Sequence, residues 1–91
     1  MTKPRLTKVQ REVLTMLATG GLLYVTQITG EAYRTYSVRK MGEQTRHLTK
    51  ATYEGLYGHA WLKYEEKEVS AFGHVTTRKY TLTTLGQEAL T

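Results

Sequence analysis

The spacing of apolar residues changes abruptly at Trp61. Before this position, Tyr53 and Leu56 recur at the spacing of one face of a helix. After it, Leu62 and Tyr64 alternate with charged residues, which is the pattern of a strand with one buried face. A chain that places a helix directly before a strand is restricted to folds that mix both elements, so we expect the α+β class.

The helix before Trp61 contains two residues that weaken helices. Thr49 has the position of its N-cap residue. Gly55 and Gly58 lie inside the helical pattern, where each costs about 1 kcal/mol relative to alanine. Together with Ala51 they form a stripe of small side chains, which would let another backbone approach closely. That backbone is either the first helix of the same chain or a partner protein, and both interpretations remain open.

Two other segments predict capped helices. In residues 6–17, Thr7 and Gln10 have capping-box spacing, and Gly20 with Gly21 supplies a C-terminal stop. The buried stripe of this helix would consist of Val9, Val13, Leu14 and Leu17. A short closing helix is expected near the C-terminus, where the capping-box spacing recurs at Thr84 and Gln87.

Residues 22–38 are rich in β-branched and aromatic side chains and contain a turn signal. Gly30 followed by Glu31 fits a two-residue type II′ turn, so we expect a β-hairpin folded at that point. This register predicts the cross-strand pairs Leu23–Val38, Val25–Tyr36, Tyr24–Ser37, Thr26–Thr35, Gln27–Arg34 and Ile28–Tyr33. A helix over residues 31–39 is the alternative interpretation.

A second hairpin is expected over residues 61–82, around a three-residue loop closed by Gly73. Its inward-facing side chains would be Leu62, Tyr64, Tyr80 and Leu82. The regular register predicts two favourable pairs of opposite charge, Glu66 with Arg78 and Glu65 with Lys79.

The net charge of +5 is concentrated in the first half of the chain. Residues 1–50 contain nine basic and three acidic side chains, a net charge of +6, whereas residues 51–91 contain four basic and five acidic ones, a net charge of −1. A basic pole on a small domain is typical of nucleic-acid-binding proteins. A surface that only keeps the protein soluble would have the same composition, so charge alone leaves both interpretations open.

The length and composition of the chain limit the number of domains and the cellular location that we expect. The 91 residues suffice for one core, so we expect a single domain over residues 1–91. The chain has no cysteine, and its N-terminal residues lack the apolar run of a signal peptide. No stretch is apolar over the length needed to cross a bilayer. The expected location is therefore the cytoplasm, without a membrane.

Residue types that carry catalysis or bind metals are scarce. The sequence has no aspartate, no cysteine and two serines, and its three histidines, His47, His59 and His74, lie in separate segments. No spacing matches a metal site, and no glycine-rich phosphate-binding loop is present. We therefore expect a protein that is not an enzyme and has no cofactor or metal. Each histidine is more simply interpreted as a surface or phosphate-facing residue.

The expected order of elements is helix, hairpin, helix, two-stranded wing and helix. With a first helix at Leu6–Leu17, a recognition helix at Leu48–Leu62 and a final stretch to Leu90, this order resembles the winged helix-turn-helix superfamily. The closing stretch Tyr80-Thr-Leu-Thr-Thr-Leu-Gly-Gln-Glu-Ala-Leu90 looks like the wing exit of PadR- and MarR-like transcription regulators. The resemblance covers about residues 6–90.

This resemblance implies a recognition helix in the major groove and a wing on phosphates or in the minor groove of double-stranded DNA. Carried over, the candidates at the helix are Arg46, His47, Thr49, Lys50, Thr52, Glu54 and His59, and those of the wing are Phe72, His74, Arg78 and Lys79. The resemblance implies a small non-enzymatic transcription regulator of a prokaryote or phage, monomeric or a weak homodimer.

The sequence departs from the superfamily pattern in two ways. The second helix of the motif is replaced or shortened by the tyrosine-rich hairpin. Between residues 49 and 60 there is no Arg, Asn or Gln, the residue types that usually read base edges. Binding dominated by phosphate contacts is therefore expected more than sequence-specific binding.

A weaker resemblance is to small winged-helix-like toxins that bind a topoisomerase. It implies the alternative function, a protein-binding adaptor or inhibitor, which would use the Gly55/Gly58 stripe or Phe72. The tyrosines and Trp61 also have a simpler interpretation as core or half-buried sheet residues.

Overall fold

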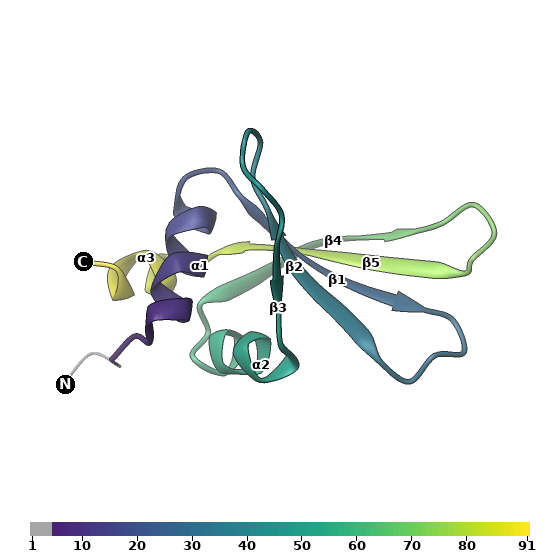
Figure 1. Cartoon of the computed structure of the whole chain (residues 1–91), viewed down its shortest axis with the longest axis horizontal. Helices are drawn as coiled ribbons and strands as arrows, with labels where there is room; N and C mark the ends of the chain where they lie inside the picture. Colours follow the sequence, from purple (N-terminus) through teal and green to yellow (C-terminus); the bar gives the residue numbers. More distant parts are fainter. Residues whose placement is uncertain (1–4) are drawn as a thin grey trace.

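The computed structural model describes residues 5–91 and contains both helices and strands, which confirms the α+β class (Figure 1). In chain order the elements are α1 (Lys8–Ala18), β1 (Leu22–Ile28), β2 (Arg34–Arg39), β3 (Arg46–Leu48), α2 (Lys50–Gly58), β4 (Leu62–Val69), β5 (Val75–Leu82) and α3 (Thr84–Ala89). No helix in this part of the chain has the length and apolar character to span a membrane.

The strands form one antiparallel sheet in the order β3-β2-β1-β5-β4. The centre of this sheet is β1, which pairs with β2 on one side and with β5 on the other. The two hairpins expected from the sequence are therefore halves of a single sheet. The strand β3 was not predicted, because it has only three residues and no alternation of apolar and polar side chains.

The first hairpin has the predicted register, from Leu23 opposite Val38 to Gln27 opposite Arg34. The predicted two-residue turn is wrong, because the strands stop at residues 28 and 34 and a five-residue connection joins them. Ile28 pairs with Val75 of β5 instead of Tyr33. The alternative helix over residues 31–39 is wrong.

The second hairpin has the predicted register only in its inner half. Leu62 lies opposite Leu82 and Tyr64 opposite Tyr80, as expected. Beyond these pairs, a β-bulge at residue 65 shifts the register by one residue. The predicted pairs of Glu66 with Arg78 and Glu65 with Lys79 are therefore wrong, and the observed pairs are Glu66 with Lys79 and Lys67 with Arg78.

The helices follow most of the predicted capping. The capping box of Thr7 and Gln10 at α1 is confirmed, and Thr49 caps α2. The cap of α3 is Thr83 instead of Thr84, since the Thr83 hydroxyl accepts a hydrogen bond from the Gly86 N–H.

The helix α2 is shorter than predicted and buries less of its predicted apolar stripe. It ends at Gly58, and Ala60 beyond it has a left-handed backbone with φ of 60°. Of the two apolar residues predicted to share a face, Leu56 is fully buried and Tyr53 is partly buried against the core, whereas the neighbouring Tyr57 side chain is exposed. Leu56 and Tyr53 therefore anchor α2 on the core, and Tyr57 remains at the surface.

The hydrophobic core lies on one side of the sheet. Side chains from α1 and α2 pack with those of alternate strand residues in a cluster that comprises Val13, Leu14, Leu17, Leu23, Val25, Tyr36, Val38, Leu56, Trp61, Leu62 and Tyr80. We call this side of the sheet the helix face. The opposite side, which carries Tyr24, Thr26, Thr35, Ser37, Thr77 and Lys79, contributes no residue to that cluster, and we call it the open face.

Candidate nucleic-acid interface

The predicted residues of α2 lie at its first turns and at its cap. The Thr49 hydroxyl accepts a hydrogen bond from the Thr52 N–H at 3.1 Å and contacts the Thr52 hydroxyl at 2.9 Å. Both threonines therefore contribute to the helix start. Lys50 and Glu54 extend from the exposed side of α2 and form an ion pair at 3.7 Å.

The two predicted residues of β3 point to opposite faces of the sheet. Arg46 lies opposite Val38, on the helix face, and forms an ion pair with Glu12 of α1. His47 lies opposite Ser37, on the open face. The expectation that Arg46 and His47 approach DNA together is not met by this geometry, because neighbouring strand residues alternate between faces.

The same alternation separates Arg78 from Lys79. Lys79 is on the open face, where its ammonium donates to Glu66 at 2.8 Å and to Glu68 at 2.7 Å. These hydrogen bonds raise the pKa of the Lys79 ammonium above its ordinary value. Arg78 is on the helix face and lies opposite Lys67. Only Arg78 of this pair thus shares a face with α2.

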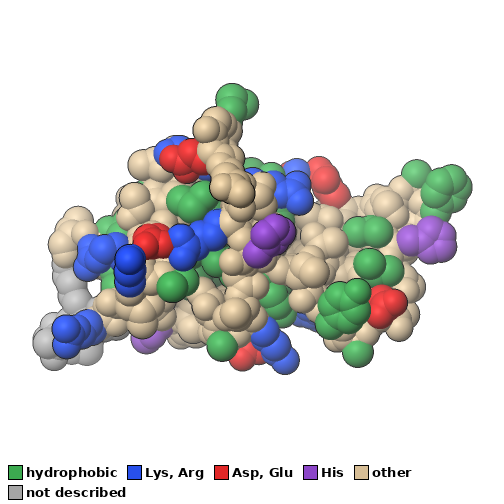
Figure 2. All heavy atoms as spheres, in the orientation of Figure 1, with side chains coloured by type: hydrophobic (Ala, Val, Ile, Leu, Met, Phe, Trp, Pro, Cys, Tyr) green, Lys and Arg blue, Asp and Glu red, His purple; other side chains and the backbone are tan. Residues whose placement is uncertain are grey.

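Phe72 and His74 occupy the loop at the far end of the β4–β5 hairpin. The Phe72 side chain is 84% exposed, and its ring centroid lies 6.3 Å from that of His74. Figure 2 shows hydrophobic and histidine side chains gathered at this tip. Because α2 lies at the other end of the sheet, the structure does not bring these two residues together with Lys50 or Glu54 (Figure 1).

A groove on the helix face connects α2 with both hairpins. At its first end, a pocket of about 630 Å³ is lined by Gln27, Ala32, Tyr33, Arg34, Tyr36, Lys50, Tyr53 and Glu54. At its second end, a pocket of about 340 Å³ is lined by Tyr57, Tyr64, Lys67, Arg78 and Tyr80. A narrow cleft containing Gln27, Arg34 and Arg78 lies between them. We call the whole surface the basic groove.

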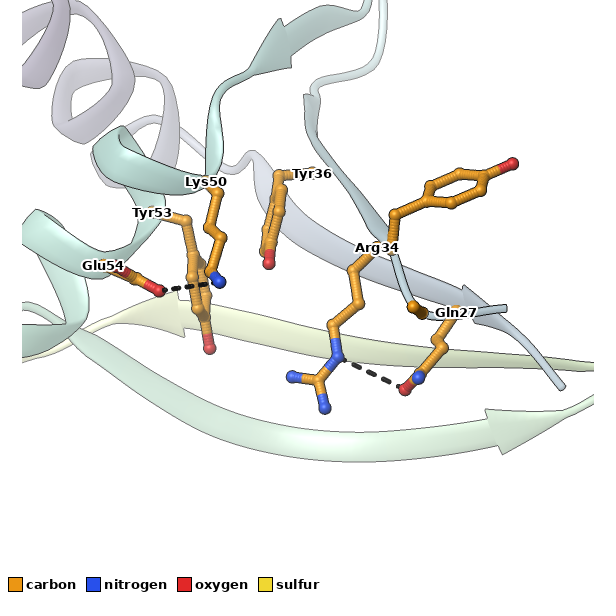
Figure 3. A pocket seen from close by; sticks show the side chains of 8 residues that line it. Gln27, Arg34, Tyr36, Lys50, Tyr53 and Glu54 are labelled. Carbon is orange, nitrogen blue, oxygen red and sulfur yellow. Dashed lines mark hydrogen bonds and ion pairs between the residues drawn. The ribbon is translucent and has the colours of Figure 1, made fainter. Parts of the chain in front are cut away.

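The first pocket has cations on two walls. In Figure 3, Lys50 and Glu54 extend from α2 on one side, and Arg34 and Gln27 extend from the hairpin on the other, with Tyr36 and Tyr53 between the two sides. The Arg34 Nε donates to the Gln27 side-chain oxygen at 3.2 Å. The two walls therefore come from segments that are distant in sequence.

The floor of the groove is a cluster of tyrosine rings. Tyr53 stacks on Tyr36 with ring centroids 4.8 Å apart, and its hydroxyl donates to the Tyr80 hydroxyl at 3.1 Å. Burial, reinforced by the hydrogen bond to Tyr80, raises the pKa of the Tyr53 phenol above its ordinary value. Tyr64 contacts Tyr80 edge-on at 5.8 Å. Packed rings of this kind give the groove a rigid base.

Three cations of the groove differ in their partners from the two lysines on the open face of the β4–β5 hairpin. Within residues 5–91, Arg34, Lys67 and Arg78 have no carboxylate at ion-pair distance. On the open face, by contrast, Lys63 is 4.0 Å from Glu65, and Lys79 binds two glutamates. The groove therefore keeps positive charge, whereas the open face of the β4–β5 hairpin neutralises its two lysines.

The stripe of small residues on α2 has two environments. A Cβ added at Gly55 would lie 3.4 Å from the side-chain nitrogen of Gln10, so this position faces α1 of the same chain. A Cβ added at Gly58 would meet nothing within 4 Å. Gly55 therefore faces α1 across a side chain at an ordinary contact distance, and the close approach of a backbone predicted for the stripe is not found at Gly55 or at Gly58 within residues 5–91.

Sequence reasoning missed most of the groove. It named Lys50, Glu54 and Arg78 but not Arg34 or Lys67. The predicted pair of Gln27 with Arg34, close to the turn of the first hairpin, was the available signal for Arg34. This end of the hairpin faces α2 because the hairpin packs against that helix. No local pattern in the sequence predicts this packing.

Comparisons with known proteins add no identification. No group of three or more potential metal-ligating side chains occurs among the residues whose positions are described. The chain matches no protein-family model, no curated protein and no solved structure. The function is therefore argued from the groove itself.

Proposed function

We propose that this protein binds double-stranded DNA through the basic groove, without catalysis, as a small transcription regulator of the winged-helix type. The observation that carries the proposal is the set of three cations, Arg34, Lys67 and Arg78, that line one groove without carboxylate partners in residues 5–91. Unneutralised cations on one surface are the electrostatic footprint of a phosphate-binding protein.

The arrangement of α2 and the β4–β5 hairpin supports the winged-helix interpretation. Both elements border the groove, so a duplex that contacts α2 would also contact Lys67 and Arg78 of the hairpin. In the position of a second helix, the chain has β1, β2 and β3 instead. The β1–β2 hairpin supplies Arg34, which adds a further phosphate contact to those of α2 and of the β4–β5 hairpin.

The chemistry of α2 favours phosphate contacts over base reading. Its exposed side chains near the groove are Lys50, Glu54 and Tyr57, and Lys50 is paired with Glu54. Bidentate recognition of a base pair in the major groove usually depends on Arg, Asn or Gln, which α2 lacks. We therefore propose affinity with weak sequence preference and a strong dependence on salt.

A charge-matched pair of double variants tests the proposal. Arg34→Gln with Arg78→Gln removes two groove cations, and Lys63→Gln with Lys79→Gln removes two cations of the open face. Affinity for a labelled mixed-sequence duplex is measured by fluorescence anisotropy over a salt series. The groove variant should flatten the slope of log K against log salt by about 1.8, which is two phosphate contacts, whereas the control should change it little.

Equal losses in the two variants would show that only net charge matters and would refute the groove as the binding site. Circular dichroism of both variants checks that they are folded. No measurable binding of the wild-type protein to duplex DNA at low salt would refute the function itself.

One observation favours the alternative function, a protein-binding adaptor or inhibitor. Phe72 is 84% exposed at a hairpin tip, where its ring adds nothing to the core. A buried aromatic anchor contributes about 2 kcal/mol or more to a protein interface. If Phe72→Ala leaves duplex affinity unchanged but abolishes binding to a purified topoisomerase, the alternative replaces DNA binding.

A further inference from the structure

The two pockets of the basic groove share one chemistry. Each combines tyrosine rings with two cations that come from different elements. In the first pocket the cations are Arg34 of β2 and Lys50 of α2, and in the second they are Lys67 of β4 and Arg78 of β5. Binding to the phosphates of a duplex would explain the cations of the pockets. It would not explain the tyrosine rings beside them.

The rings at the rim of these pockets are too exposed to serve the core. Tyr33 is 61%, Tyr57 is 56% and Tyr64 is 49% exposed, although each lines a pocket. An exposed aromatic ring beside a cation is the usual arrangement of a surface that binds unpaired nucleotides, because the ring stacks on a base and the cation contacts the adjoining phosphate.

We propose that the two pockets receive unpaired bases of the bound nucleic acid, one base in each pocket. This inference rests on the proposed function and specifies which form of DNA the groove prefers. In a fully paired duplex the faces of the bases are covered by their neighbours, so the tyrosine rings have nothing to stack on. An extrahelical base exposes its face while its phosphate remains within reach of the same groove.

The size and charge of the pockets agree with this occupant. The volumes, about 630 and 340 Å³, lie in the range of sites that hold small ligands. The only carboxylate that lines either pocket is Glu54, and it is paired with Lys50. An anionic unit with a planar ring is thus complementary to both pockets in shape and in charge.

The test compares three labelled duplexes of one sequence. The first is fully paired, the second carries a bulge of two thymidines, and the third carries a bulge of two abasic residues. The abasic bulge has the same number of phosphates as the thymidine bulge but offers no base. We expect the wild-type protein to bind the thymidine bulge about a hundredfold more tightly than the abasic bulge, which is about tenfold for each of the two stacked bases.

Variants assign this preference to the pockets. Tyr57→Leu with Tyr64→Leu keeps apolar side chains on the surface but removes two rings from the second pocket. This double variant should lose the tenfold contribution of the second pocket and keep that of the first, measured as the ratio of its affinities for the thymidine and abasic bulges. Phe72→Leu is the matched control, because it removes an exposed ring outside both pockets and should leave the preference intact.

Failure of the inference and failure of the proposed function give different results. Equal affinity of the wild-type protein for all three duplexes overturns the inference and leaves duplex binding in place. If no duplex binds, a single-stranded thymidine oligonucleotide and its abasic counterpart are compared. Tighter binding of the thymidine strand then supports the pockets while refuting duplex binding, and no binding to either strand overturns both.

Discussion

The two faces of the sheet place neighbouring cations in opposite surroundings. Lys79 lies on the open face with two glutamates at hydrogen-bonding distance. Arg78, the preceding residue of β5, lies on the helix face opposite Lys67 and has no carboxylate partner within residues 5–91. The comparison teaches that the positive charge available to a ligand depends on the face on which a residue lies, more than on the number of cations in the segment.

The β-bulge in β4 creates this difference. Without it, Glu66 would lie opposite Arg78, and the groove would hold an ion pair in place of two free cations. The extra residue at position 65 shifts the register, so that Glu66 and Glu68 join Lys79 on the open face. Bulges of this kind commonly redirect side chains near functional sites.

The largest effect is expected when one residue on each face of the sheet is replaced and the losses of stability are compared. Leu23 and Thr26 lie on β1 and point to the helix face and the open face, respectively. Leu23→Ala removes a fully buried side chain and should lower the free energy of unfolding by about 3 kcal/mol. Thr26→Ala should lower it by less than about 1 kcal/mol. Urea denaturation measures both.

Similar losses in these two variants would contradict a core that lies on one face only. A Thr26→Ala variant as unstable as Leu23→Ala would indicate that the open face is covered in solution, as by a second copy of the chain. Sedimentation of the wild-type protein would then check for a dimer.

Reversing the charge of one lysine on each face of the sheet compares the contributions of the two faces to duplex binding. Lys67→Glu puts a carboxylate opposite Arg78 in the groove, whereas Lys63→Glu makes the same change of charge on the open face. The first variant should weaken duplex binding by about tenfold or more, because it removes one phosphate contact and neutralises another. The second should weaken it only slightly. Anisotropy at one fixed salt concentration suffices, and a larger loss in Lys63→Glu would reverse the assignment of the faces.

The change of stability with pH in the alkaline range tests the burial of the tyrosine rings at the floor of the groove. The pKa of Tyr53 is raised in the folded protein by burial, so the folded state keeps its proton at a pH at which the unfolded state has lost it. This contribution is fully present below the unfolded pKa, near 10, and is lost as pH rises through the folded pKa.

Tyr53→Phe has no proton to lose, so its stability should fall less steeply than that of the wild-type protein between about pH 10 and 11. The comparison uses thermal unfolding at matched pH values, and Tyr24→Phe on the open face is the control. Parallel curves for the wild type and Tyr53→Phe would show that the Tyr53 phenol is not shielded.

The smallest effect is expected when the bulge is deleted. Removal of Glu65 leaves Glu66 opposite Lys79 and Lys67 opposite Arg78, because the bulged residue has no partner of its own in the ladder. Stability should change by less than about 1 kcal/mol and duplex affinity by about twofold at most. A large gain in duplex affinity would contradict the bulge. It would mean that Glu66 lies opposite Arg78 in the wild-type protein and that the deletion moves this carboxylate out of the groove.

Local patterns determined the parts of the fold that depend on residues close in sequence. The capping box of Thr7 and Gln10 spans three residues, and its two hydrogen bonds form as predicted. The first hairpin has the predicted register from Leu23 to Gln27, because alternation of apolar and polar residues on both strands permits only one buried face. The α+β class follows from the change of period at Trp61.

The candidate site was predictable only in part. Lys50, Glu54 and Arg78 were named from the sequence and do line the groove. Arg46 and His47 were named with them, but they lie on opposite faces of β3. Exposed cations can be recognised in a sequence, whereas the face on which each one lies follows from strand register.

Tertiary structure alone decided the groove. It joined the two hairpins through β1 and β5, segments about fifty residues apart, and it placed the bulge at Glu65. The regular and bulged registers of β4 both satisfy the local pattern and both pair opposite charges. The choice between them depends on the twist of a sheet built from distant strands and on Lys79, which binds two glutamates in the bulged form. That Lys67 and Arg78 have no carboxylate partner within residues 5–91 is the consequence of that choice, and no single segment of the sequence determines it.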